Sequence, residues 1–179
     1  MPLAPDFYSA EMVRAMPADG NRYEVVHGEL CVTPAPRRRH QDVAMRLVSL
    51  LLKYCGRNSA GQVYNVAADI SWSDDTLVQP DVFVVAPGQD GIEWKDVRRL
   101  SLVAEVLSPS TSRFDRFQKR RLYQEQRVGT IWIIDADRRA VEVWTPRATQ
   151  PVIETERLTW HPAGAPGPLL VDLATLFAQ

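Results

Sequence analysis

The chain has 179 residues, 45% of them hydrophobic, and its 21 basic and 22 acidic residues leave a net charge of −1. This length supports one well-packed domain over residues 1–179 and is too short for two comfortable ones. With a net charge near zero, the protein as a whole is not attracted to nucleic acid or to an anionic membrane surface. Any patch that binds either of them must therefore be local.

The cysteines and the N-terminal segment indicate a cytoplasmic protein. Cys31 and Cys55 form no disulfide framework and suit a reducing compartment. The N-terminus lacks a basic region followed by an apolar run, and no segment reaches the roughly 18 uninterrupted apolar residues of a spanning helix. We therefore expect no membrane segment.

The first third of the chain predicts a short helix, a β-hairpin and a long helix. Ser9 can cap the first helix. His27-Gly28 suits a two-residue hairpin loop, and the apolar residues that follow the hairpin recur at helical spacing. The predicted elements are a helix over 10–16, strands over 22–26 and 29–33, and a helix over 40–56.

The rest of the chain alternates strand-like runs with one long helical segment. The order favours an α/β fold, with a mixed central sheet flanked by helices and preceded by the N-terminal hairpin. Asp172 can cap a short C-terminal helix. The predicted elements are strands over 62–70, 76–85, 101–107, 130–135 and 141–144, and a helix over 112–127.

Two carboxylates in these strand-like runs stand out, Asp81 and Glu105. Glu105 interrupts an apolar strand, and burying an ionised carboxylate costs several kcal/mol unless a partner or a metal compensates it. Asp81 follows Gln79-Pro80, and the proline removes a ladder donor, so the strand is an edge, a bulge or locally splayed there. If both acids share one face, their oxygens suit Mg²⁺ or Mn²⁺.

The helix that follows offers a cation. Lys119 has Asp115 four residues before it and Tyr123 four residues after it, so the three share one face. Lys119 can therefore approach the carboxylates, or it can be an exposed lysine paired with Asp115. Glu105 can likewise be a structural carboxylate paired with an arginine such as Arg116.

Other polar residues have both local and functional interpretations. The basic run Arg37-Arg38-Arg39 can touch a nucleic-acid backbone or form a solvated loop. His40 can be a ligand, a phosphate contact or a local hydrogen-bonding group. Gln79 can support the site or be merely polar at a strand edge.

Taken together, these segments resemble a bacterial restriction-endonuclease-like family of the PD-(D/E)xK nuclease superfamily, over residues 8–177. The matching features are a strand acid after proline, a second acid one strand later, and polar residues on the next helix. They are Gln79-Pro80-Asp81, the run from Ala104 to Thr111, Asp115, Lys119, Arg120, Tyr123, Tyr23-Glu24, Gly28-Glu29-Leu30, His40 and the run from Ile131 to Asp135.

The resemblance implies particular roles, with one departure from the superfamily pattern. That pattern has a lysine two residues after the strand acid, where this chain has Leu107. Lys119 on the following helix is therefore the candidate replacement. The resemblance implies a metal held by Asp81, Glu105 and Glu29, with Glu24 competing for the role of Glu29, and with His40, Gln79 and Tyr123 in support.

The implied activity is that of an endonuclease, which hydrolyses DNA phosphodiester bonds with Mg²⁺ or Mn²⁺ as the cofactor. The family resemblance also leads us to expect a homodimer, with DNA as the substrate and no organic cofactor. Two alternatives stay open. One is a non-catalytic module that kept the fold to bind DNA or protein, and the other is a metal-dependent hydrolase of a small phosphate ester.

Overall fold

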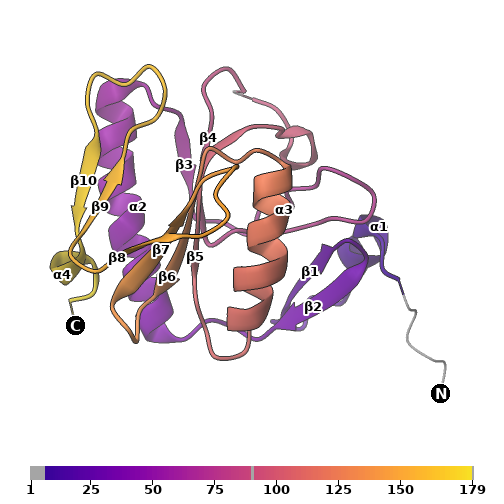
Figure 1. Ribbon diagram of the computed structural model, residues 1–179. Coiled ribbons are helices and arrows are strands. Elements are labelled where there is room, and N and C mark those ends of the chain that lie inside the picture. Colours follow the sequence, from indigo (N-terminus) through magenta and orange to yellow (C-terminus); the bar gives the residue numbers. More distant parts are fainter. Residues whose placement is uncertain (1–6, 90, 179) are drawn as a thin grey trace.

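The computed structural model describes residues 7–89 and 91–178. A six-stranded mixed sheet forms its centre (Figure 1), with the strand order β3-β4-β5-β6-β7-β8. Strands β5 and β6 are parallel, and every other neighbouring pair is antiparallel. The strands are β3 (Gln62–Tyr64), β4 (Val82–Val85), β5 (Leu100–Val106), β6 (Thr130–Asp135), β7 (Ala140–Trp144) and β8 (Val152–Glu154).

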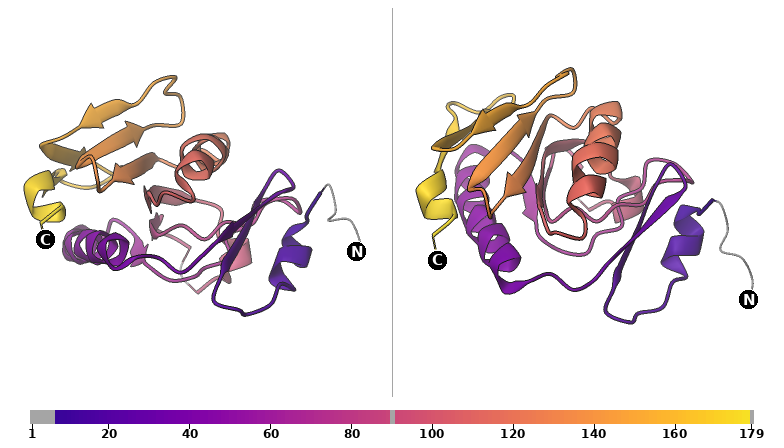
Figure 2. Two further views of the ribbon diagram at one scale, coloured as in Figure 1. Left: turned by 90° about the horizontal axis from the view of Figure 1, so that it is seen from below. Right: turned by 60° about the horizontal axis from the view of Figure 1, so that its bottom comes forward.

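Helices cover both faces of this sheet (Figure 2). The long helix α2 packs on one face, while the π-helical segment η2 runs directly into α3 over the other. The helical segments are α1 (Ala10–Arg14), α2 (Arg38–Asn58), η1 (Trp94–Asp96), η2 (Phe114–Lys119), α3 (Arg120–Glu125) and α4 (Leu173–Leu176).

Strand β5 shows how the sheet divides the core. Leu102, Ala104 and Val106 belong to the apolar cluster on the α2 face, and Val103 belongs to the cluster on the α3 face. Because successive side chains of a strand point to opposite faces, Glu105 is directed to the α3 side. The fold therefore aims this carboxylate at η2 and α3.

Two antiparallel hairpins lie at opposite ends of the molecule (Figure 2), one beside α1 and the other beside α2 and α4. The N-terminal hairpin turns at His27 (φ 49°) and Gly28 (φ 80°), two consecutive left-handed residues, as a tight two-residue loop requires. The hairpin strands are β1 (Arg22–Val26), β2 (Glu29–Thr33), β9 (Arg157–Trp160) and β10 (Leu169–Asp172).

The predicted α/β class, mixed sheet and N-terminal hairpin are confirmed, but two strand boundaries are wrong. The strand predicted over 62–70 ends at Tyr64, and the one predicted over 76–85 begins only at Val82. Pro80 explains the second difference, because it has no N–H for the ladder. Ile70 and Val78 form only an isolated bridge. The hairpin of β9 and β10 was not predicted.

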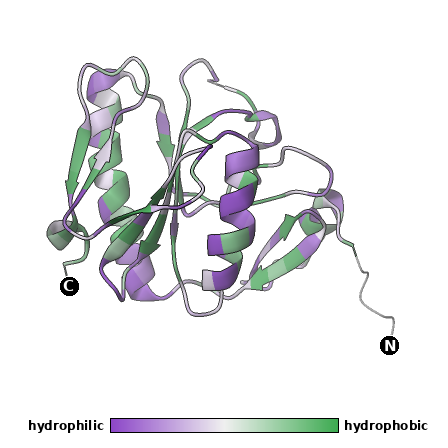
Figure 3. Cartoon of the chain, viewed as in Figure 1, coloured by the Kyte–Doolittle hydropathy of each residue, from purple (hydrophilic) through white to green (hydrophobic). Residues whose placement is uncertain are grey.

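The hydropathy of the chain follows this architecture. Figure 3 shows hydrophobic colour on the central strands and hydrophilic colour over much of the η2–α3 helix. Across residues 7–89 and 91–178, no helix combines the length and apolar character needed to cross a membrane.

Candidate active site

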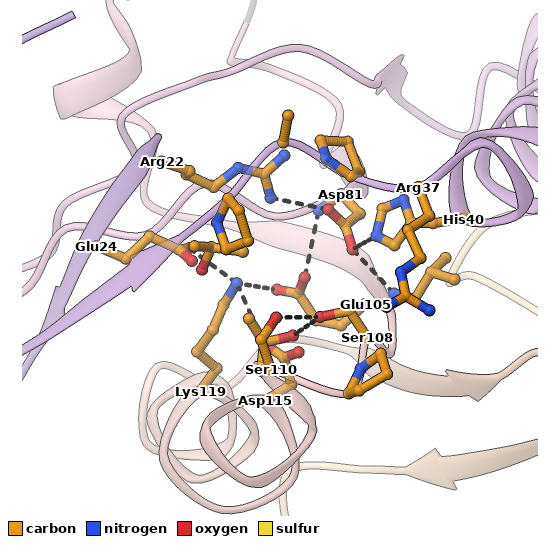
Figure 4. A pocket seen from close by; sticks show the side chains of 17 residues that line it. Arg22, Glu24, Arg37, His40, Asp81, Glu105, Ser108, Ser110, Asp115 and Lys119 are labelled. Atoms are coloured by element: carbon orange, nitrogen blue, oxygen red, sulfur yellow. Dashed lines mark hydrogen bonds and ion pairs between the residues drawn. The ribbon is translucent and has the colours of Figure 1, made fainter. Parts of the chain in front are cut away.

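A pocket of about 220 Å³ lies where the N-terminal hairpin, the start of α2 and the segment between β5 and η2 meet (Figure 4). Its lining is strongly charged: four carboxylates, three permanent cations and one histidine. These residues are Glu24, Asp81, Glu105 and Asp115; Arg22, Arg37 and Lys119; and His40.

Asp81 and Glu105 lie opposite each other at the β4–β5 edge of the pocket. Val82 pairs with Ala104 in the antiparallel register, so Asp81, one residue before β4, lies across from Glu105. The Asp81 backbone N–H donates to Glu105 Oε2 at 3.4 Å, and the Val106 N–H donates to Asp81 Oδ2 at 2.9 Å. The side chain of Asp81 thus takes over a backbone bond where the ladder stops.

Two side chains hold Asp81 in its ionised form. Arg22 Nη1 is 2.8 Å from Oδ1, and His40 Nε2 is 2.9 Å from Oδ2. Burial by itself would raise the pKa of Asp81, but the hydrogen bond and charge of His40, together with the charge of Arg22, outweigh burial and hold that pKa below its ordinary value. Arg22 had not been predicted as a site residue. Its position two residues before Glu24, on the same face of β1, was the available signal.

Lys119 is fully buried and reaches three carboxylates. Its Nζ lies 2.8 Å from both Glu24 Oε1 and Glu105 Oε1, and 3.7 Å from Asp115 Oδ1. Burial would lower the pKa of Lys119, but the charges of Glu105 and Glu24 outweigh it and raise that pKa well above its ordinary value. The lysine therefore does approach the strand acid from the following helix, as Figure 4 shows.

The backbone of η2 contributes to this arrangement. Asp115 and Lys119 are the two buried residues of the π-helical segment. Short π-helical turns inside α-helices are frequently found at functional sites. Beyond this segment, Tyr123 is fully buried and donates its hydroxyl hydrogen to Glu105 Oε1, next to the Lys119 contact.

Gln79 takes part through its backbone. Its N–H donates to Glu24 Oε1 at 2.7 Å, and its carbonyl accepts from Arg22 Nη1 at 3.2 Å. The side-chain amide donates to Asp69 at 2.7 Å and does not line the pocket. The residue therefore fixes two charged side chains of the site without presenting its own.

The structure does not bring Glu29 to the two strand carboxylates. Glu29 is exposed at the turn end of β2 and is not part of the pocket lining, whereas Glu24 is buried and contacts Lys119. In the hairpin register Glu24 pairs with Cys31, and Glu29 lies two residues, about 7 Å, further along the strand. Glu24 is therefore the hairpin acid that reaches the site.

Negative charge is in surplus inside the pocket. Among the described residues, the four carboxylates contact two permanent cations, the partly exposed Arg22 and the buried Lys119, while Arg37 lies exposed at the rim. Burial raises the pKa of Glu105 to about 8 and that of Asp115 to about 6; neighbouring carboxylates add to both shifts, although Lys119 opposes them. Without a further cation, the folded protein therefore keeps protons on these acids at pH values below their raised pKa values.

The pocket offers a divalent cation such as Mg²⁺ two carboxylate ligands, with the other ligands left to water and substrate. No group of three or more His, Cys, Asp or Glu residues within 7–89 and 91–178 is arranged to hold a metal. Mg²⁺ is, however, commonly bound by one or two carboxylates, with water and substrate phosphate as the other ligands. Asp81 and Glu105 supply such a pair, and the charge surplus would be offset by one divalent ion.

A solved structure identifies the class of this fold. The chain is similar to a crystal structure titled as "a putative nuclease belonging to DUF820 from Anabaena variabilis ATCC 29413", with a TM-score of 0.77. The match covers 96% of this chain and 98% of the other at 19% sequence identity. The chain therefore has a nuclease-like fold.

The family follows from the sequence match. Residues 10–168 match the Uma2 family, described as "Putative restriction endonuclease", and the chain belongs to that family. The resemblance drawn from the sequence is thereby confirmed. A search of the curated proteins gave no match. The homodimer and the cytoplasmic location stay predictions.

Proposed function

We propose that this chain is an endonuclease that hydrolyses DNA phosphodiester bonds with Mg²⁺ or Mn²⁺. The observation that carries the proposal is the meeting of Asp81, Glu105 and Lys119 in one pocket, with Asp81 8% exposed and the other two 1% exposed. Charged groups are so costly to bury that their convergence calls for a chemical reason. Membership of a family named for restriction endonucleases supports DNA as the substrate.

Each side chain has a definable part in such a reaction. Asp81 and Glu105 would hold the divalent cation, whose chemistry is to make a water more acidic and to neutralise charge on the phosphate. The Lys119 ammonium would orient the attacking water or stabilise charge on the phosphoryl oxygens. Arg22 and His40 keep Asp81 ionised and in place, and Tyr123 orients Glu105.

The two other functions have less support. A small phosphate ester would need a pocket that encloses it, and about 220 Å³ is below the roughly 300–1,000 Å³ of small-molecule sites. A module that only binds DNA or protein has no use for Glu105 and Lys119 in its interior, because apolar residues of similar size stabilise a core at least as well. The binding-module function remains an outcome of the experiment below.

The first experiment is a calorimetric titration of Mn²⁺ into the wild type, Asp81→Asn and Glu105→Gln. The matched control is Glu29→Gln, which removes an exposed carboxylate that does not line the pocket. We expect saturable binding that both pocket substitutions abolish and that Glu29→Gln leaves within about twofold, because surface substitutions change little. Circular dichroism checks that each variant is folded.

A positive titration then justifies a cleavage screen with single-stranded, branched and duplex DNA. Cutting by the wild type and by Glu29→Gln, but not by Asp81→Asn or Glu105→Gln, is the expected result. If the folded wild type binds no Mn²⁺, or if binding is indifferent to both pocket substitutions, the metal-dependent mechanism is excluded and the binding-module function takes its place.

A further inference from the structure

Three consecutive arginines at the start of α2 differ in what they contact. Arg39 is paired: its guanidinium lies 3.1 Å from Asp137 Oδ1 and donates to the Ala136 carbonyl at 2.6 Å. Arg38 is 94% exposed and lies 3.7 Å from Asp42 on its own helix. Arg37 lines the pocket (Figure 4), and its guanidinium has no hydrogen-bond or ion-pair partner among residues 7–89 and 91–178.

Arg37 also differs from the other basic groups of the pocket. Arg22, His40 and Lys119 each contact a buried carboxylate, so their charge is used inside the protein. Arg37 is exposed to solvent at the rim, and its charge is not used in this way. Arg37 therefore adds a positive charge at the mouth of the pocket that no carboxylate of the described residues contacts directly.

The local backbone adds to the positive potential at this rim. Arg37 is the N-cap of α2, a helix of 21 residues whose cap makes no side-chain hydrogen bond and whose first turn contains no acidic residue. The N-terminal end of a helix carries a partial positive charge that acidic side chains usually complement. Among the described residues, neither the cap nor the first turn of α2 supplies an acidic side chain, and an external anion would supply the missing charge.

We propose that Arg37 is a substrate-binding residue that contacts a phosphate next to the phosphodiester group entering the pocket. The inference rests on the proposed function, because it assumes a nucleic-acid substrate with regularly spaced phosphates. The planar guanidinium can donate two parallel hydrogen bonds to one phosphate group. Its place at the rim suits the neighbouring phosphate, since the interior is occupied by the carboxylates and Lys119.

The experiment measures DNA binding, not cutting, with Ca²⁺ in place of Mg²⁺. Fluorescence anisotropy follows a labelled single-stranded oligonucleotide and the matching duplex over a series of sodium chloride concentrations. The variants are Arg37→Ala and Arg37→Lys, and the matched control is Arg38→Ala, which removes the adjacent exposed arginine. Circular dichroism checks folding; the Arg37 side chain has no partner among the described residues, so we expect every variant to fold.

We expect Arg37→Ala to weaken binding about tenfold, as for loss of a charge-assisted hydrogen bond. The slope of log K against log salt should fall by about 0.7–0.9, the value for one phosphate contact. Arg37→Lys should keep the slope and lose a few-fold in affinity, because lysine cannot bind in a bidentate manner. Arg38→Ala should stay within about twofold of the wild type.

Three results would overturn the inference. If the wild type binds DNA and Arg37→Ala binds it equally well, Arg37 makes no phosphate contact. The proposed nuclease function is not affected by that result. Equal losses in Arg37→Ala and Arg38→Ala would mean a diffuse basic surface with no specific contact. A wild type that binds Mn²⁺ and neither form of DNA would exclude single-stranded and duplex DNA as substrates, and with them this inference.

Discussion

Two cations of the same helical segment each bridge carboxylates from other elements, but in different surroundings. Arg116 lies 3.0 Å from Asp135 and 2.7 Å from Glu142, and its side chain is 26% exposed. Lys119, three residues later, is 1% exposed among its carboxylates. Water screens the first cluster, so its formation costs little and contributes little. The second must overcome desolvation, which marks it as functional more than stabilising.

Removing the buried cation should have the largest effect. Lys119→Met leaves Glu24, Glu105 and Asp115 without their shared partner, and such a broken buried pair costs about 3–5 kcal/mol of unfolding free energy. Urea denaturation of the metal-free protein near pH 8 measures the loss. A smaller loss near pH 5 is also expected, because carboxylates with raised pKa values are then protonated. A loss below about 1 kcal/mol at pH 8 would place this cluster in the same class as the Arg116 cluster.

The pH dependence of stability should come from the buried cluster. The pKa of Glu105 is raised from 4.5 to about 8, and that of Asp115 from 3.8 to about 6. Between these limits the folded protein holds protons that the unfolded chain has released, so the stability of the metal-free protein falls as the pH rises. Asp81 has a lowered pKa and contributes the opposite slope only under more acidic conditions.

The size of this effect distinguishes the two clusters. We expect the unfolding free energy of the metal-free protein to decrease by an amount on the order of a few kcal/mol between about pH 5 and pH 8. Urea denaturation at a series of pH values measures this decrease. Glu105→Gln should remove most of the decrease above pH 6, because the amide does not titrate. A wild-type profile that is flat or rises over this range would show that Glu105 is ionised throughout.

Removing the half-exposed cation should have the smallest effect. Arg116→Met is expected to lower the unfolding free energy by at most about 1 kcal/mol, since its partners regain water when the arginine is lost. Added salt should shrink the difference between variant and wild type further. A salt-independent loss as large as that of Lys119→Met would contradict the contrast between the clusters.

Much of the fold could be predicted because local patterns and tertiary packing agree. The hairpin limits at 22–26 and 29–33 match β1 and β2, and the strand predicted over 130–135 matches β6. Where Pro80 removes a ladder bond, propensity overestimated the strand. The hairpin of β9 and β10 escaped prediction because its strands are short and their pairing spans a turn-rich segment.

The amino-acid sequence by itself determined which ionisable residues are candidates for the site. Asp81 after a proline, Glu105 in an apolar strand and Lys119 on the next helix are visible as residue types whose burial needs compensation. Strand periodicity also determined that Glu105 and Val103 share a face. These properties are local, so a single sequence is enough to read them.

Only the tertiary structure decided which further residues join these candidates in the pocket. It selected Glu24 over Glu29, added Arg22 as the partner of Asp81, and left one arginine of the basic run unpaired at the pocket. Each of these choices depends on how the N-terminal hairpin and α2 are placed against the sheet. A local pattern does not contain that placement, because the contacts join residues 24 and 119 or 22 and 81, which are far apart in the chain.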